Sequence, residues 1–275
     1  MSTLGVTILA APAEPLDTCL ASIKQVDQIL VYSWDPKQIE VAHAHGAQTA
    51  LISTVSHELI RDEMQASLAT DWVLLLDPDE IPEIGAIESF RAKIASAPEA
   101  VVGFWIPYRT FFLGTELTKS FANLRQLRLF RRNRVSYRKL IHESPSPLSG
   151  YFEHVDMAEP GIAHNFVFDL QRRFERHLQW AKIEALEQYQ QGAQLTDPAD
   201  VLRAGLREFC KYAVEQQGLE DGCAGLINAL MHGWKQIAML CFLWELQKAP
   251  NMPVRLSAQI KEFCAELEAR DWSID

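Results

Sequence analysis

Three carboxylates stand together directly after an apolar run, in the segment Asp77-Pro78-Asp79-Glu80 that follows Leu74-Leu75-Leu76. Two Asp residues separated by one position at the end of a strand can hold a hard divalent cation, and such a cation can bridge the phosphates of a substrate. The alternative is that Asp79 or Glu80 only caps a helix that begins at Pro82. The elements around the segment must decide between these interpretations.

Two later segments carry further groups that could take part in chemistry. Glu143, in Ile141-His142-Glu143, could act as a general base towards a hydroxyl group. His164 could be a metal ligand if a partner held its second ring nitrogen. Each residue alone is more often structural, so their interpretation depends on the rest of the chain.

Basic residues gather just before Glu143, and no acidic residue interrupts them between Arg125 and Lys139. Such a run could face a diphosphate, an anionic glycan or a membrane surface, or it could be the solvated face of a β-ribbon. Arg128 and Arg131 in this run, together with His142 and Glu80, are candidates for contacts with a phosphate or an acceptor.

The elements that must position these residues alternate between strand and helix over the first half of the chain. The sequence predicts strands at 6–9, 28–32, 48–52 and 72–76, separated by helices at 16–24, at 37–45 and after Ser56. This order predicts a parallel sheet. In an open sheet of this kind, ligands bind beyond the carboxyl ends of the strands, which favours a functional role for the carboxylates after residue 76.

The pattern changes in the second half. Longer β segments are expected at 101–112, 126–131 and 136–141. Helices are expected from Leu170, where apolar residues recur at helical spacing, and at 199–215, 221–248 and 256–270. We therefore predict an α/β domain over residues 1–168 and a C-terminal helical region over residues 169–275.

Several short segments follow one another along the chain and cover roughly residues 60–246. They are Asp71 to Glu80, Phe112-Leu113-Gly114, Gln126 to Arg132, His142-Glu143, His164, Gly218 to Leu226 and Leu243-Trp244-Glu245. In these segments and their order the chain resembles glycosyltransferase family 2, in particular the bacterial branch that contains lipopolysaccharide-core glucosyltransferases.

The resemblance implies a GT-A fold, a Rossmann-like mixed sheet that binds a nucleotide sugar. Asp77 and Asp79 would then bind Mn2+ or Mg2+ and the diphosphate of the donor, with Glu80 supporting them. His164 would be a late metal ligand. Glu143 would be the catalytic base of an inverting transfer, taking the proton of an acceptor hydroxyl while the metal stabilises the departing nucleoside diphosphate.

The first 60 residues depart from the family pattern. Tyr32 or Ser33 stands where the family has an Asp that contacts the base, and Arg61-Asp62 replaces an Arg-Asn pair. We therefore expect Arg61 to contact the donor, and Tyr32 or Trp34 to stack on its base.

The net charge of -10 argues against nucleic-acid binding. The five cysteines form no C-x-x-C pair, which indicates reduced, mostly buried thiols in a cytoplasmic protein. Neither a signal peptide nor a membrane-spanning helix is expected. The apolar residues between Leu226 and Leu243 could pack on the rest of the protein, form a homodimer or rest on the inner membrane surface.

The favoured function is sugar transfer from a nucleotide sugar, preferably a UDP-sugar, to a glycan or a lipid-linked acceptor of lipopolysaccharide biosynthesis. One alternative is a non-catalytic binding or scaffold protein on the same fold with a degraded donor site. A sugar nucleotidyltransferase is disfavoured, because the turn from Ala10 to Pro15 lacks the glycine and arginine that such an enzyme needs.

Overall fold

The protein is represented by a computed structural model that describes residues 2–12, 14–52, 57–137, 145–167, 169–248 and residue 258. Side chains are described at all of these positions except 57–59 and 166–167. The described residues form two compact units. The first contains residues 2–109 and 123–164, and the second contains residues 110–122 and 165–248.

The first unit begins with four parallel strands in the order β3-β2-β1-β4. The strands are β1 (Leu4–Ala10), β2 (Gln28–Ser33), β3 (Gln48–Leu51) and β4 (Trp72–Leu76). The helices between them are α1 (Leu16–Ser22), α2 (Pro36–Ala44) and α3 (His57–Ala66). Every residue of β1 and β4 is buried, as expected of parallel strands covered on both faces.

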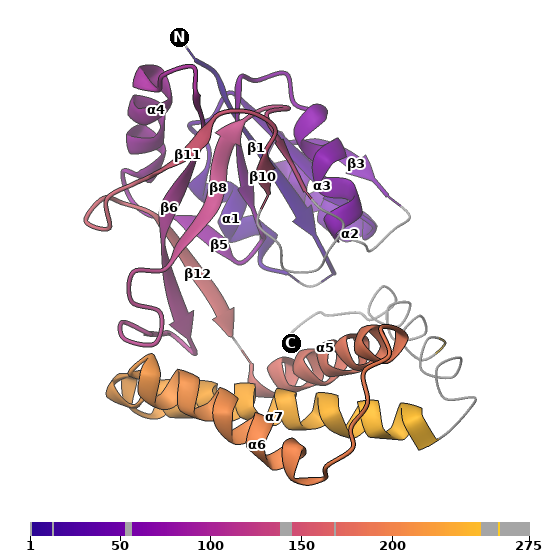
Figure 1. Ribbon diagram of the computed structural model, residues 1–275. Helices are drawn as coiled ribbons and strands as arrows, with labels where there is room; N and C mark the ends of the chain where they lie inside the picture. The colour runs from indigo at the N-terminus through magenta and orange to yellow at the C-terminus, as the bar shows by residue number, and fades with distance from the viewer. Residues whose placement is uncertain are drawn as a thin grey trace. The chain divides into compact units, whose positions relative to one another are not determined.

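The sheet continues beyond β4 with strands that make it mixed, in the order β8-β6-β12-β5 (Figure 1). Strand β8 runs antiparallel to both β4 and β6, and β12 runs antiparallel to β5. These strands are β5 (Glu80–Pro82), β6 (Val101–Phe112), β8 (Arg125–Arg131) and β12 (Ile162–Val167). The smaller elements are α4 (Ala86–Ser96), β7 (Thr115–Glu116), β9 (Val135–Ser136), β10 (Ser146–Pro147) and β11 (Tyr151–His154).

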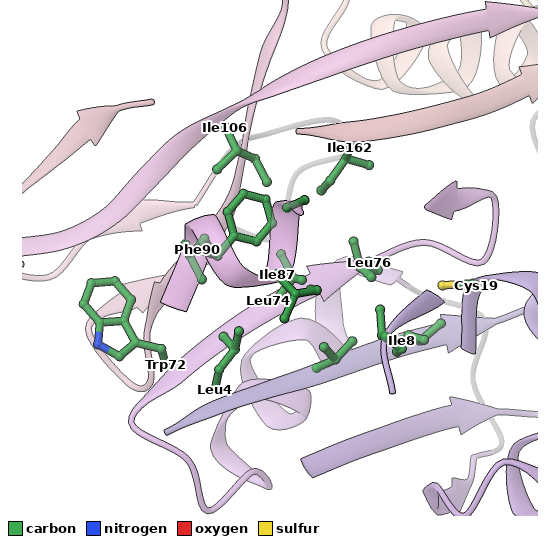
Figure 2. Packing of buried hydrophobic residues seen from close by; sticks show 14 of the residues in the cluster. Leu4, Ile8, Cys19, Trp72, Leu74, Leu76, Ile87, Phe90, Ile106 and Ile162 are labelled. Carbon is green, nitrogen blue, oxygen red and sulfur yellow. The ribbon is translucent and has the colours of Figure 1, made fainter. Parts of the chain in front are cut away.

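Alternate residues of β4 enter two different apolar clusters. Trp72, Leu74 and Leu76 pack in the larger cluster, which contains residues of β1, α1, α4, β6 and β12 (Figure 2). Val73 and Leu75 enter a second cluster with residues of α3 and β2. The period of two along the strand therefore places an apolar core on each face of the sheet.

The second unit is built on three long helices. They are α5 (Leu170–Gln190), α6 (Ala199–Cys210) and α7 (Gly222–Lys248), with the π-helical η1 (Lys211–Glu215) and the 3-10 helix η2 (Gly218–Asp221) between α6 and α7. Both α5 and α6 pack along α7 (Figure 1). The approach of α6 to α7 requires glycine, because a Cβ on Gly205 would lie 2.4 Å from Cγ1 of Ile237.

A carboxylate holds the segment 110–122 on this unit. Asp221 accepts hydrogen bonds from the backbone N–H groups of Lys119 and Ser120 at 2.9 and 2.8 Å. The Ser120 hydroxyl donates to the same carboxylate at 2.7 Å. The Gly218 to Leu226 segment, which the sequence marks as a family motif, thus has a structural function here.

The α/β class, the Rossmann-like mixed sheet and the C-terminal helical region are confirmed. The second unit also includes residues 110–122, which the sequence placed in the first domain. The assignment of nucleotide-sugar binding to residues 1–168 stays a prediction, and the helix expected at 256–270 lies outside the described residues except for residue 258.

Two further expectations concern single residue types and hydropathy. The prediction of mostly buried thiols is wrong for the described cysteines, because Cys19 is buried but Cys210, Cys223 and Cys241 are exposed. No helix within the described ranges has the length and apolarity that crossing a membrane requires.

Candidate active site

The candidate site lies where β4 ends. Strand β4 pairs with β1 on one side and with the antiparallel β8 on the other, and its carboxyl end leads into Asp77, Pro78 and Asp79. The chain turns there, with the N–H of Glu80 donating to the carbonyl oxygen of Asp77 at 3.0 Å, and β5 begins at Glu80. The helix-cap interpretation is wrong, because α4 begins at Ala86 and its N-cap residue Gly85 makes no side-chain cap.

Glu80 is fully buried and organises the turn. One carboxylate oxygen accepts hydrogen bonds from the Tyr108 hydroxyl and from Nη2 of Arg128. The other accepts the N–H of Asp77 at 3.0 Å. Burial raises the pKa of Glu80 to about 7, although the charge of Arg128 acts in the opposite direction. Glu80 is therefore an internal anchor for the loop. Its complete burial contradicts the predicted contact of Glu80 with a phosphate or an acceptor.

Asp77 is held by two arginines. Nη2 of Arg128 lies 2.6 Å from Oδ2 of Asp77, and Nη2 of Arg61 lies 3.9 Å from Oδ1. Arg128 comes from β8 and Arg61 from α3, so two elements converge on this carboxylate. Asp77 and Arg61, which the sequence assigned to donor binding, are thus adjacent.

Asp79 meets His164 on its other side. Nε2 of His164 lies 3.5 Å from Oδ2 of Asp79, and both side chains are partly exposed, at 22% and 19%. The β5–β12 ladder causes this proximity, because it pairs His164 directly with Glu80. The Tyr108 ring lies 5.0 Å from the imidazole ring, centroid to centroid. Two residues that are 85 positions apart in the chain are thereby brought to one point.

A divalent cation fits this arrangement with two ligands from the protein. Asp79 offers a carboxylate oxygen and His164 an imidazole nitrogen. Asp77, which the sequence also assigned to the metal, is instead engaged by Arg128. Among the described residues no group of three or more His, Cys, Asp or Glu side chains is arranged to hold a metal. Mg2+ and similar ions commonly take one or two carboxylates and complete their shell with substrate phosphates and water. The residues present suit that mode of binding.

Tyr32 does not fit its predicted role. Its side chain is 3% exposed in the second apolar cluster, and its hydroxyl donates to Ser67 at 2.9 Å. A ring enclosed on both faces cannot stack on a nucleotide base, so the prediction for Tyr32 is wrong. Trp34, the alternative, lies at the end of β2 and is half-buried against the same cluster.

The arginines of the basic run do not form one surface. Arg131 stacks on Trp72 at 4.5 Å and donates from Nε to the carbonyl of Val101 at 2.9 Å. It pairs with the first residue of β4, at the opposite end of that strand from Asp77, so its predicted phosphate contact is wrong. Arg128 lies three residues from Arg131, at a register shift in the pairing of β8 with β6, and reaches the carboxylates of Asp77 and Glu80.

Two residues near the carboxylates were not predicted from the sequence. Tyr108 belongs to a strand that was predicted, but nothing in its surroundings in the sequence indicated a partner in Glu80. Tyr137 is 5% exposed, and the guanidinium carbon of Arg61 lies 5.4 Å from its ring centroid. Burial raises the pKa of Tyr137 to about 12, so its hydroxyl keeps its proton. The predicted base Glu143 and its neighbour His142 lie outside the described residues.

Sequence comparisons assign no relative, because no family model and no curated protein matches the chain. Solved structures do match. One is glucosyl-3-phosphoglycerate synthase from Mycobacterium tuberculosis in complex with Mn2+, UDP and glucosyl-3-phosphoglycerate, at 18% identity and a TM-score of 0.34, covering 39% of this chain and 44% of that one. The same synthase with Mg2+ and UDP matches at 18% identity and a TM-score of 0.33, covering 44% and 47%.

These matches span less than half the length of the synthase, and their TM-scores indicate only a distant likeness. They do not assign the chain to a family. We therefore infer function from the geometry around Asp77 and Asp79.

Proposed function

We propose that the protein is a metal-dependent glycosyltransferase that moves a sugar from a nucleotide-sugar donor to an acceptor hydroxyl. The observation that carries this proposal is the pairing of Asp79 with His164 beside the arginine-held Asp77, at the carboxyl end of β4. A site of this composition offers two ligands to a divalent cation and has arginine side chains close by. A bound cation and the arginines would each stabilise the negative charge of the diphosphate that leaves when a nucleotide sugar reacts.

The residues of the site have separate roles in this proposal. Asp79 and His164 would hold Mn2+ or Mg2+, which would supply positive charge to stabilise the diphosphate. Arg61 and Asp77 contact the donor, and Arg128 keeps Asp77 in place together with Glu80 and Tyr108. Since Arg128 is only 8% exposed, its role is to position Asp77 and not to bind an acceptor directly.

The base and the stereochemistry are proposed from the sequence resemblance. Glu143 takes the proton of the acceptor hydroxyl as its oxygen bonds to the anomeric carbon, while the bond from that carbon to the diphosphate breaks. The anomeric configuration is inverted. His142 is a candidate for acceptor contacts.

The resemblance also supports the finer assignments. We propose a UDP-sugar as donor, a glycan or lipid-linked acceptor of lipopolysaccharide biosynthesis, and a cytoplasmic protein that could lie at the inner membrane surface. Exposed apolar residues of α7, namely Leu226, Leu230, Trp234 and Trp244, are where membrane contact or a homodimer would form. Nucleic acid is not a proposed partner.

The second candidate function is a non-catalytic binding protein on the same fold. It is favoured by the burial of Tyr32 and by the engagement of Asp77 with Arg128, since both reduce the groups free to contact a donor.

A thermal-shift screen with UDP-, GDP-, ADP- and CMP-sugars, each with Mn2+ and with EDTA, tests the proposal. A donor at about 100 times its dissociation constant stabilises the folded state by about 2.7 kcal/mol, which is a shift of a few degrees. We expect a shift with one nucleotide class that disappears in EDTA. The absence of a shift with every donor would overturn the proposal, and a shift without turnover on any acceptor would favour the binding protein.

A further inference from the structure

Helix α7 exposes one long face that carries no charge. Its exposed side chains between residues 223 and 244 are Cys223, Leu226, Leu230, Trp234, Cys241 and Trp244. The other sides of α7 are also apolar, and they pack against α5 and α6. A helix that is apolar all round is typical of a protein interior. The exposed face of α7 is therefore a surface that we expect a partner to cover.

Helix α6 extends this face. Gly205 of α6 lies against Ile237 and Phe209 lies against Gly233, so the two helices run in opposite directions. In an antiparallel pair of right-handed helices, the residue that follows each contact residue turns by about 100° towards the same side of the pair. The exposed apolar side chains on this side are Leu202 and Leu206 of α6 and Leu230 and Trp234 of α7. Together with the exposed face of α7 they form what we call the α6–α7 face.

The α6–α7 face has the size of a small protein interface. Residues 223–244 extend over about 32 Å at 1.5 Å per residue, and packed helices lie about 8–10 Å apart. The strip on α7 and the shorter strip on α6 then cover roughly 450 Å² per chain. Two copies would bury roughly 900 Å² in total, which is near the lower limit of about 1,000 Å² for a specific interface. We therefore expect an association that depends on protein concentration.

The lack of charge suits a second copy of the same chain. In a two-fold contact the same surface meets itself, so a charge near its centre would face its own copy. No exposed residue of α7 from 223 to 244 is charged, and this repulsion is therefore absent. The face also presents two tryptophans, Trp234 and Trp244, and tryptophan is enriched among the residues that contribute most to protein interfaces.

The charges around the face disfavour a lipid surface. Peripheral helices that lie on anionic lipid carry lysine and arginine beside their apolar side. The charged residues of α6 and α7 nearly balance, since the basic ones are Arg203, Arg207, Lys235 and Lys248 and the acidic ones are Asp200, Glu208 and Glu245. The chain as a whole has a net charge of -10, which anionic lipid repels.

We propose that the α6–α7 face joins two copies of this chain into a homodimer, with the two α7 helices antiparallel across a two-fold axis near Trp234. Cys223 and Trp244 lie at nearly equal distances along α7 on either side of Trp234. The pairing therefore sets the large Trp244 against the small Cys223 of the partner subunit, and large residues opposite small ones let two helices interdigitate. The dimer does not depend on the proposed transferase function.

Sedimentation equilibrium of the full chain over a dilution series tests the proposal. Wild type should have the mass of two chains at high concentration and of one chain at low concentration. The double variant Leu230→Glu, Trp234→Glu places like charges opposite each other in the interface, and its dissociation constant should rise about a hundredfold or more. Ile84→Glu is the matched control, since Ile84 is a fully exposed apolar residue of the first unit, and it should dimerise as wild type does.

Thiol alkylation gives a second readout that needs only wild type, so the test does not depend on whether the double variant folds. Cys223 and Cys241 are exposed in the single chain and would be covered in the dimer. Iodoacetamide should therefore label both more slowly at high concentration, and the labelling rate should rise on dilution in step with the fraction of monomer. Cys19, which is buried, should stay unlabelled throughout. Mass spectrometry of peptides measures each site separately.

A wild type that is monomeric at every concentration would overturn the proposal. If its two thiols then resist labelling, residues of the chain after 248 cover the face. If it instead floats with vesicles of phosphatidylcholine and phosphatidylglycerol, the face binds lipid. A dimer that persists in the folded double variant, or labelling of Cys223 and Cys241 that does not change on dilution while wild type dissociates, would also overturn it and place the interface elsewhere.

Discussion

At the scale of residues, the two Asp side chains of the loop after β4 have different partners and should respond differently to the same change. Asp79 meets His164 at 3.5 Å, whereas Asp77 is held by Arg128 at 2.6 Å. Asp79→Asn should abolish the stabilisation by Mn2+ and donor and lower transfer by about a hundredfold or more, because a metal ligand is lost. Its melting temperature without ligand should change little.

Asp77→Asn serves as the comparison, since this change, unlike Asp79→Asn, removes a salt-bridge partner of Arg128. It should lower the melting temperature without ligand, which thermal denaturation of the two variants would measure side by side. Sugar transfer by Asp79→Asn at the wild-type rate would contradict the metal assignment.

A second contrast is between Arg128 of β8, whose ion pair is buried, and Arg134 of the turn after β8, whose ion pair is exposed. Arg128→Ala leaves the buried Glu80 and its neighbour Asp77 without their cation, and breaking a buried pair in this way typically destabilises by about 3–5 kcal/mol. Arg134→Ala removes an exposed pair with Glu99 and should change stability by less than about 1 kcal/mol. Urea unfolding measures both, and equal effects would show that the network around Glu80 contributes little.

At the scale of elements, β4 could be predicted because it is a continuous apolar run, and the other parallel strands could be predicted from their regular alternation with helices. The spacing of four between Ile60 and Met64 places both on one face of α3. The short strands β5 and β12 have no such apolar pattern. Their pairing also joins segments some 80 positions apart in the chain, which no local pattern predicts. The contact between Asp79 and His164 was therefore accessible only through resemblance. Periodicity predicts a strand but not which sheet face each residue takes, and this is why Tyr32 and Arg131 were misassigned.

The start of α7 makes a prediction that opposes helix propensity. Replacing a helical glycine by alanine usually stabilises by about 1 kcal/mol. A Cβ on Gly225, however, would lie 1.9 Å from the carbonyl oxygen of Gly218. Gly218 begins η2, the 3-10 helix that ends at Asp221, whose carboxylate holds the segment 110–122. Gly225→Ala should therefore destabilise by about 2 kcal/mol or more. Urea unfolding measures the sign, and a stabilised variant would contradict the close packing of η2 on α7.

At the scale of the whole molecule, the buried His177 and the half-buried His232 make stability depend on pH. Burial lowers the pKa of His177 and of His232 to about 3, and Arg173 and Lys235 act in the same direction. Between about pH 6.5 and 3 the unfolded chain binds protons at these positions and the folded chain does not. Their contribution is therefore complete above pH 6.5 and is lost as the pH falls, at about 1.4 kcal/mol per pH unit for each histidine.

The double variant His177→Gln, His232→Gln should lose less of its unfolding free energy than wild type when the pH is lowered from 7.5 to 5, by a difference of about 2–4 kcal/mol in urea titrations. Comparing the two proteins separates this effect from Glu80, whose raised pKa acts with the opposite sign because the folded state binds a proton that the unfolded state releases. His154→Gln, at an exposed position, should behave as wild type. Parallel pH profiles for the double variant and wild type would mean that the two imidazoles accept protons in the folded state, and that water reaches the contact between His177 of α5 and His232 of α7.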